Sequence, residues 1–314
     1  MKTRYLNALF FTLIFCISCS TNQMSDNIVF KWIDAEIDKK YFEKVAMVIE
    51  SNFGVDTNTI RLQLDLAAPE SMLYINHLPT YLTNDLGDSI FSSKELNYKL
   101  PSEYRIKVGN NISRRDFLIM NYETDENLEE SIKYFPDVSS IGTLGRDIIK
   151  QSILIDYSKC MINIDLPKQK LNKLKDQAVL KLDIHIEDNY LIYLPVSVKD
   201  KIYWVMMDTG SSMFNLLLNQ TGFLAFNPKE NFDSFNISAW GESTNVKLVS
   251  DSIAFNLGNK LFSMDKFFYR SDQNFDCLRL SKPNEIAIGV IGNQLFLENK
   301  IIIDYENSEF YILE

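Results

Sequence analysis

Alternating apolar and polar residues along much of the chain predict β-strands rather than helices. Residues 180–186 show the pattern clearly, as Leu-Lys-Leu-Asp-Ile-His-Ile, which is typical of a strand with one buried face. Other strands are indicated by short apolar runs that end at turn-forming residues, such as residues 205–207 before Asp208. The acidic stretch at residues 123–130 predicts a loop or a short exposed helix. We therefore expect a mostly β protein.

The apolar run at residues 205–207 leads into the motif Asp-Thr-Gly-Ser-Ser, formed by Asp208, Thr209, Gly210, Ser211 and Ser212. A carboxylate on a tight loop after a strand can meet a second carboxylate there. The two then share one proton, because adjacent carboxyl groups cannot both ionise. In such a pair one oxygen activates water while the shared proton polarises a carbonyl group. Taken alone, the motif also fits a surface turn.

A second landmark follows near the C-terminus, where Ile-Gly-Val-Ile-Gly at residues 288–292 precedes Ile-Ile-Ile-Asp-Tyr at residues 301–305. Together with the motif, this order resembles the retropepsin-like and pepsin-like aspartic proteases. The resemblance implies an all-β barrel lobe in which an apolar-Gly pair lies beside the catalytic loop. It also implies that Asp208 is catalytic and that four neighbours support its loop: Thr209, Gly210, Ser211 and Ser212.

The closing segment occurs twice in the chain. Ile-Gly-Thr-Leu-Gly at residues 141–145 precedes Ile-Leu-Ile-Asp-Tyr at residues 153–157. An intermediate landmark also recurs, because an aspartate follows seven residues after both Gly109 and Gly258. The separation of the copies far exceeds the ~20–50 residues of solenoid repeats. We therefore predict two retropepsin-like β-barrel lobes with short helices, related by internal duplication.

This duplication divides the chain into lobes of ordinary domain size. The Lys-rich segment between them fits a linker by composition, or alternatively a short amphipathic helix with a solvated basic face. The expected parts are a signal peptide at 1–18, an N-terminal lobe with a degenerate loop at 28–166, the linker at 167–176, and a C-terminal lobe with the intact motif at 177–314.

Projecting the repeat backwards places the first copy of the catalytic loop at Asp65, at the end of an apolar strand. Its neighbours depart from the family pattern, since Leu66 has no hydroxyl and Ala67 replaces glycine. Alanine is costly where a loop needs positive φ or close backbone contact. Asp65 is therefore a candidate partner for Asp208, with a turn-capping aspartate as the alternative. Glu70 is a less favoured substitute carboxylate.

The resemblance implies an aspartic-type endopeptidase that hydrolyses peptide bonds in an interlobe cleft, with a peptide or unfolded protein as substrate. One alternative pairs Asp208 with its copy in a homodimer. Another is a catalytically inactive pseudoprotease that binds peptides or protein partners. A β-hairpin flap is expected to close the cleft, with Trp240 and Gly241 at its tip, although a tryptophan packed at an ordinary hairpin explains the same residues.

The N-terminus predicts export from the cytoplasm. Two basic residues precede an apolar stretch at residues 6–17, which is too short for a lasting membrane span and fits a signal peptide. Ser18 before Cys19 resembles a bacterial lipoprotein processing site, which implies lipidation of Cys19. We expect a lipid anchor in the bacterial cell envelope, periplasmic or at the cell surface, with ordinary secretion as the alternative.

Composition narrows the chemistry further. The net charge of -10 argues against a nucleic-acid partner. The chain has only two histidines, His77 and His185, which read as ordinary sheet residues, so neither a histidine-based triad nor a zinc site is expected. We expect no cofactor and no metal. Cys160 and Cys277 fall in different predicted lobes, and either pair or remain as free thiols.

Overall fold

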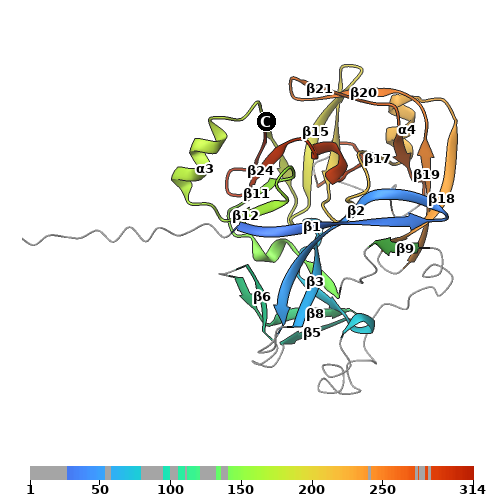
Figure 1. Ribbon diagram of the computed structural model, residues 1–314. Helices are drawn as coiled ribbons and strands as arrows, with labels where there is room; N and C mark the ends of the chain where they lie inside the picture. Colours follow the sequence, from blue (N-terminus) through green and yellow to red (C-terminus); the bar gives the residue numbers. More distant parts are fainter. Residues whose placement is uncertain are drawn as a thin grey trace, which may run out of the picture.

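The computed structural model (Figure 1) describes residues 27–53, 58–78, 95–99, 105–109, 112–120, 132–135, 141–239, 242–272, 275, 280–281 and 284–314. Several predicted features lie outside these residues: the signal peptide, Cys19, the flap tip at Trp240 and Gly241, and Cys277. Within the described part of the chain, every helix is too short or too polar to span a membrane.

The structure confirms the expectation of a mostly β chain. The described strands of the first half are β1 (Asn27–Ile37), β2 (Lys40–Phe53), β3 (Asn58–Leu64), β4 (Met72–Tyr74), β5 (Glu95–Lys99), β6 (Ile106–Val108), β7 (Ile112–Arg114), β8 (Asp116–Met120), β9 (Ile132–Phe135), β10 (Gly142–Leu144), β11 (Ser152–Asp156) and β12 (Met161–Ile164). Two short 3₁₀ helices accompany them, η1 (Ile75–His77) and η3 (Arg146–Ile148).

The second half has a similar content. Its described strands are β13 (Leu180–Asp183), β14 (His185–Ile186), β15 (Ile192–Val198), β16 (Lys201–Met207), β17 (Leu217–Leu218), β18 (Phe232–Ala239), β19 (Glu242–Val249), β20 (Ile253–Leu257), β21 (Lys260–Met264), β22 (Phe267–Tyr269), β23 (Ala287–Ile291), β24 (Lys300–Asp304) and β25 (Glu309–Leu313). The helices that lie wholly within the described residues of this half are α3 (Lys168–Lys175), α4 (Gln220–Phe226) and the 3₁₀ helix η4 (Asn293–Phe296).

The two halves use the same series of strand pairings around their central strands. In the first half, β10 pairs in parallel with β3 and antiparallel with β4, and β4 pairs in parallel with β8. In the second half, β23 pairs in parallel with β16 and antiparallel with β17, and β17 pairs in parallel with β22. Both halves therefore place the end of one strand, β3 or β16, beside a buried parallel neighbour.

The recurring glycine landmark marks an equivalent turn in each half. Gly109 follows β6 with a φ of 60°, and Gly258 follows β20 with a φ of 55°. These turns lie within the hairpins β6–β7 and β20–β21, whose first strands pair with β2 and β15 respectively. Positive φ explains why glycine stands at both positions.

One continuous sheet joins the halves, because β11 of the first half pairs antiparallel with β24 of the second, from Ser152 opposite Asp304 to Asp156 opposite Lys300. The long β1–β2 hairpin also reaches the second half and lies beside β18 (Figure 1). There Phe42 packs against Phe235 with ring centroids 4.9 Å apart. The halves are thus joined both by backbone pairing and by side-chain packing.

The strand expected at residues 180–186 is divided into two. β13 pairs with β25 in the sheet that joins the halves, whereas β14 pairs with β15 in the second sheet. Between them, Ile184 donates its backbone N–H to Ser308 O at 3.0 Å. Alternation correctly predicts extended backbone here, but it cannot show a change of partner strand.

The segment expected as a linker forms α3, in agreement with the helical alternative. Leu171 is buried on one face of this helix, and the expected solvated basic face does not extend to Lys175. The Lys175 ammonium group forms ion pairs with Asp304 and Glu309. Burial tends to raise the pKa of Glu309, but hydrogen bonds from Lys175 and Lys181 outweigh it and lower this pKa to about 2.

Lys175→Met is expected to reduce the free energy of unfolding by about 3 kcal/mol at pH 7, because it leaves the buried Asp304 carboxylate without its cation. Urea unfolding measures the loss. A lowered carboxylate pKa stabilises the fold above the ordinary pKa, and this contribution is lost as the pH falls through the folded value. The difference from wild type should therefore shrink between pH 4.5 and pH 2.

Lys173→Met is the matched control, because Lys173 lies on the same helix and is exposed to solvent. It should change the free energy of unfolding by less than about 0.5 kcal/mol. Equal losses in the two variants would contradict a structural role for the Lys175 ion pairs.

Candidate active site

Two aspartates lie side by side where β3 and β16 end. The backbone N–H of Asp65 donates to Leu144 O at 3.0 Å, and that of Asp208 donates to Ile291 O at 3.0 Å. Each aspartate is thus held by the parallel neighbour of its own strand, β10 or β23. The two carboxyl groups are hydrogen-bonded to each other. The structure therefore brings together the two residues that the sequence repeat selected as candidates.

Asp65 is largely removed from water, with 7% of its surface exposed. Burial raises its pKa well above the usual range, and the neighbouring Asp208 raises it further by charge repulsion and by a hydrogen bond. Backbone N–H groups of Ala67 and Ala68 act in the opposite direction, but they do not outweigh burial. The arrangement therefore favours a proton on Asp65.

The two carboxyl groups are supported differently. Asp208 accepts hydrogen bonds from the backbone N–H of Gly210 at 2.7 Å and from the Ser211 hydroxyl at 2.6 Å. Asp65 accepts two backbone hydrogen bonds, from Ala67 at 2.9 Å and Ala68 at 3.0 Å, both on Oδ1. Ala68 stands where the intact motif has Ser211, so no hydroxyl reaches Asp65 from this position.

The predicted strain at Ala67 is wrong, because neither Ala67 nor Gly210 has a positive φ. Glycine is needed at position 210 for a different reason. A Cβ atom there would lie 2.6 Å from the Asp65 carboxyl carbon and 3.0 Å from Asp208 Oδ1. The constraint is thus the close approach of the second loop to both carboxyl groups, which an alanine in the first loop does not disturb.

The Thr209 hydroxyl ties the two loops together. It donates to Leu64 O at 3.0 Å and accepts from the backbone N–H of Leu66 at 2.9 Å, and Thr209 is fully buried. Leu66 has no hydroxyl with which to return the interaction. Instead, the Gln63 amide donates to Gly210 O at 2.8 Å. The loops are therefore bound across the interface by a threonine from one side and a glutamine from the other.

A buried polar chain supports the motif from behind. Asn293 donates its side-chain amide to Thr209 O at 3.0 Å and to the Ser212 hydroxyl at 2.7 Å. The Tyr157 hydroxyl in turn donates to Asn293 Oδ1 at 2.8 Å, so a first-half residue supports the second-half loop. Sequence reasoning missed Gln63, Tyr157 and Asn293 as site residues. Only the position of Asn293 directly after Gly292 hinted at its role.

The aspartates of the two Ile-Asp-Tyr segments accept hydrogen bonds from residues of the turns that follow them. Asp156 accepts from the Ser158 hydroxyl at 2.8 Å, and Asp304 accepts from the Asn307 amide at 2.7 Å. His185 lies in β14 as expected and contacts Glu187, with Nε2 2.9 Å from the carboxylate. His77, in contrast, lies in the 3₁₀ helix η1 rather than in a strand.

The histidine, cysteine and acidic side chains of the described residues form no group of three or more suited to a metal ion. Cys160 is a free thiol.

The hairpin expected as a flap is present as β18 and β19, which pair along their full described length. Its stem is anchored in an apolar cluster with Phe214 and Met206, next to the Asp208 motif, through the buried Phe235 and Ile237. On the other side, Asp38 accepts from the backbone N–H of Asn236 at 3.0 Å. The β1–β2 hairpin therefore holds the stem in place.

Comparison with known proteins does not assign this chain to a family. No family model matches the chain, and no curated protein matches it. Among solved structures, the chain is similar to the crystal structure of basic 7S globulin from soybean, with 10% identity and a TM-score of 0.46 over 92% of this chain and 95% of that chain. A likeness this distant carries no conclusion about activity.

The raised pKa of Asp65 predicts a pH-dependent stability. A raised carboxyl pKa stabilises the fold below the ordinary value, and the contribution is lost as the pH rises through the folded value. Because asparagine does not ionise, the Asp65→Asn variant does not lose stability in this way as the pH rises. The variant should therefore gain at least about 1 kcal/mol relative to wild type between pH 4 and pH 8, measured by urea unfolding at each pH. Parallel pH profiles would contradict the protonation of Asp65.

Thr209→Val should lower the free energy of unfolding by about 2–4 kcal/mol, because it leaves the Leu66 N–H and the Leu64 carbonyl without their buried partner. Thr209→Ser keeps the hydroxyl and loses one methyl group, so a loss of about 1 kcal/mol is expected. Chemical denaturation of both variants measures the difference. A larger loss for serine than for valine would assign Thr209 to packing instead.

Proposed function

We propose that the protein is an aspartic-type endopeptidase in which Asp65 and Asp208 activate water for peptide-bond hydrolysis. The observation that carries this proposal is the hydrogen-bonded pair of carboxyl groups, one of them buried with a raised pKa. Such a pair holds one proton between two carboxylates, which provides a general base and a general acid at the same place.

The two aspartates would take different parts in the first step. Asp208, whose carboxylate accepts hydrogen bonds from Gly210 and Ser211, takes a proton from the attacking water. Asp65 gives its proton to the carbonyl oxygen, which becomes the hydroxyl of a tetrahedral intermediate. Asp208 then passes the proton from water to the leaving nitrogen as the C–N bond breaks. Recovery of the hydroxyl proton by Asp65 restores the starting state.

The matching strand pairings support the proposed architecture of two pepsin-like lobes related by internal duplication, 28–166 and 177–314. Each lobe would supply one carboxylate to a shared cleft. Because both carboxyl groups meet within one chain, catalysis needs no homodimer. The β18–β19 hairpin would close the cleft over a peptide or an unfolded protein segment, with Trp240 and Gly241 at its tip.

The runner-up is a pseudoprotease that binds peptides or protein partners without cleaving them. It is favoured by the asymmetry of the two loops, since Ala68 offers no hydroxyl to Asp65 whereas Ser211 bonds Asp208. In either case, the proposed location is the bacterial cell envelope, with a lipid anchor on Cys19 that keeps the protein at the membrane and exposes the cleft to extracytoplasmic substrates.

The proposal predicts cleavage of a reduced and alkylated protein by the chain from residue 20 onward, which retains all the described residues. Activity should be highest in acid and should fall as the pH rises through the raised pKa of Asp65, because the general acid is then lost. Asp65→Asn and Asp208→Asn should each lower kcat/KM at least about 100-fold. Product release measured by mass spectrometry from pH 3 to pH 7 tests the pH dependence and the effect of the two substitutions.

Asp176→Asn is the control, since this carboxylate is exposed at the end of α3, outside the proposed flap and cleft, and the substitution should leave the rate unchanged. Activity that survives Asp65→Asn but not Asp208→Asn would favour a dimer built on Asp208 alone. A folded wild-type protein that binds the substrate and leaves it intact at every pH would establish the pseudoprotease instead.

A further inference from the structure

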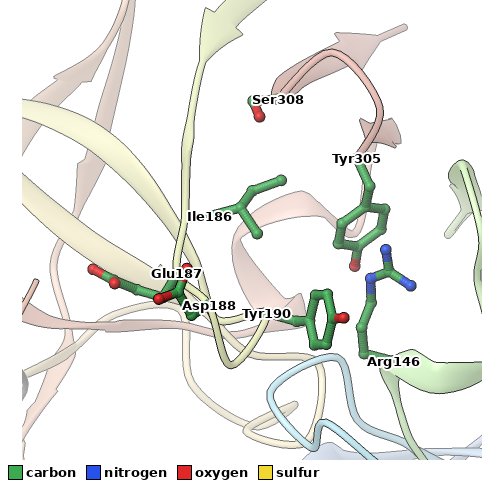
Figure 2. A pocket seen from close by; sticks show the side chains of 7 residues that line it. All are labelled: Arg146, Ile186, Glu187, Asp188, Tyr190, Tyr305 and Ser308. Carbon is green, nitrogen blue, oxygen red and sulfur yellow. The ribbon is translucent and has the colours of Figure 1, made fainter. Parts of the chain in front are cut away.

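A pocket of about 340 Å³ lies at the seam of the two halves. Its walls come from η3 of the first half and from two turns of the second half, β14–β15 and β24–β25. The lining residues are Arg146, Ile186, Glu187, Asp188, Tyr190, Tyr305 and Ser308 (Figure 2). Its volume lies at the lower end of the range for small-molecule sites.

This pocket occupies the position that the buried polar chain occupies in the other half. Tyr157, which ends one Ile-Asp-Tyr segment, bonds Asn293, the residue after the closing glycine of the opposite half. Tyr305 ends the other Ile-Asp-Tyr segment, and it packs against Arg146, the residue after the closing glycine Gly145. The two tyrosines therefore make equivalent cross-contacts, one with an asparagine and one with an arginine.

The Tyr157 hydroxyl has a hydrogen-bond partner in Asn293, whereas the Arg146–Tyr305 contact includes no such bond. Among the described residues, neither Arg146 Nε nor the Tyr305 hydroxyl has a hydrogen-bond partner, although both atoms are buried. Arg146 is 7% exposed, and its guanidinium carbon lies 3.6 Å from the centroid of the Tyr305 ring. Unpaired buried donors of this kind cost free energy until an acceptor reaches them.

The charge of Arg146 is also uncompensated within the described part of the chain. The adjacent Asp147 pairs with Arg114 instead. One guanidinium nitrogen of Arg146 donates to Ile149 O, which fixes the group in place. Burial raises the pKa of the Tyr305 phenol, so its hydroxyl remains a donor at neutral pH. A fixed cation and a phenol hydroxyl together form a site for a negatively charged acceptor.

The opposite end of the pocket limits the charge of the ligand. Figure 2 shows Glu187 and Asp188 across the pocket from Arg146, with Tyr190 between. Glu187 has a lowered pKa: burial tends to raise it, but hydrogen bonds from Ser281 and His185 outweigh burial, so the group is ionised. Negative charge at this end disfavours a dianion such as phosphate, while Ile186 and the two tyrosine rings accommodate an apolar body.

We propose that this pocket binds a small carboxylate of single negative charge, whose oxygens accept hydrogen bonds from Arg146 Nε and the Tyr305 hydroxyl. The carboxylate can belong to a free organic acid or to the C-terminus of a short peptide. The site adjoins the proposed active site, because the Arg146 backbone N–H donates to Ala68 O in the Asp65 loop at 2.7 Å. The proposal does not depend on peptidase activity.

Isothermal titration calorimetry with the chain from residue 20 onward tests the proposed carboxylate site. Benzoate is the probe for a free acid, N-acetylphenylalanine is the probe for a peptide C-terminus, and N-acetylphenylalanine amide lacks the charge. At least one of the two acids should bind with a Kd below about 10 mM, and the amide should not. Preference between the acids identifies the source of the carboxylate. Inorganic phosphate should bind more weakly than either acid.

Tyr305→Phe should raise the Kd of the bound acid about tenfold, which corresponds to one hydrogen bond to a charged group. It should not lower the melting temperature, because the lost hydroxyl has no partner in the described residues. Tyr157→Phe is the matched control: it loses the hydrogen bond to Asn293 and some stability, and it should keep the Kd. Arg146→Gln should abolish binding, and Asp208→Asn should leave it unchanged.

Any of these results would overturn the proposal: no binding of any probe to the folded wild type, equal affinity for the acid and its amide, or a Kd that Tyr305→Phe does not change. Tyr305→Phe decides the matter if Arg146→Gln fails to fold. Loss of acid binding in Asp208→Asn would place the ligand in the peptide cleft instead of this pocket.

Discussion

The contact between two carboxyl groups, one of them buried, constrains the rest of this structure. Asp65 and Asp208 come from strands far apart in sequence, and their repulsion must be relieved by a proton and by hydrogen bonds. Thr209 and Gln63 bind the two loops to each other across the interface. The strand pairings of both halves, the β11–β24 junction and the packed β1–β2 hairpin all hold these loops in contact.

Asymmetry at this contact follows from how each loop is built. The second loop carries the hydroxyls of Thr209 and Ser211, whereas the first relies on the backbone N–H groups of Ala67 and Ala68. The same division recurs behind the loops. The Tyr157–Asn293 hydrogen bond closes one side with protein atoms. In the wall of the pocket, the Arg146–Tyr305 contact leaves two buried donors without a partner among the described residues. A difference in side chains between the two halves thus makes a candidate binding site at one of two matching positions.

Much of the candidate site could be read from the sequence because its signals are local or repeated. The loop motif marks Asp208, and the repeat spacing selects Asp65 even though its neighbours have changed. Gly109 and Gly258 mark equivalent turns, since positive φ restricts the choice of residue. Gln63, Tyr157 and Asn293 carried no comparable signal. Each acts on a partner in the other half, and such a contact leaves no periodicity or spacing in the chain.

The sequence by itself determined the mostly β character, the paired landmarks and the identity of the two aspartates, because these depend on side-chain alternation and on residues with restricted backbone geometry. Tertiary structure decided the rest. It divided the predicted strand at Ile184 between two sheets, made a helix with a buried ion pair from the expected linker, and showed that Gly210 is needed for close approach rather than for positive φ. These outcomes depend on which surfaces meet, and that is fixed only when both halves pack together.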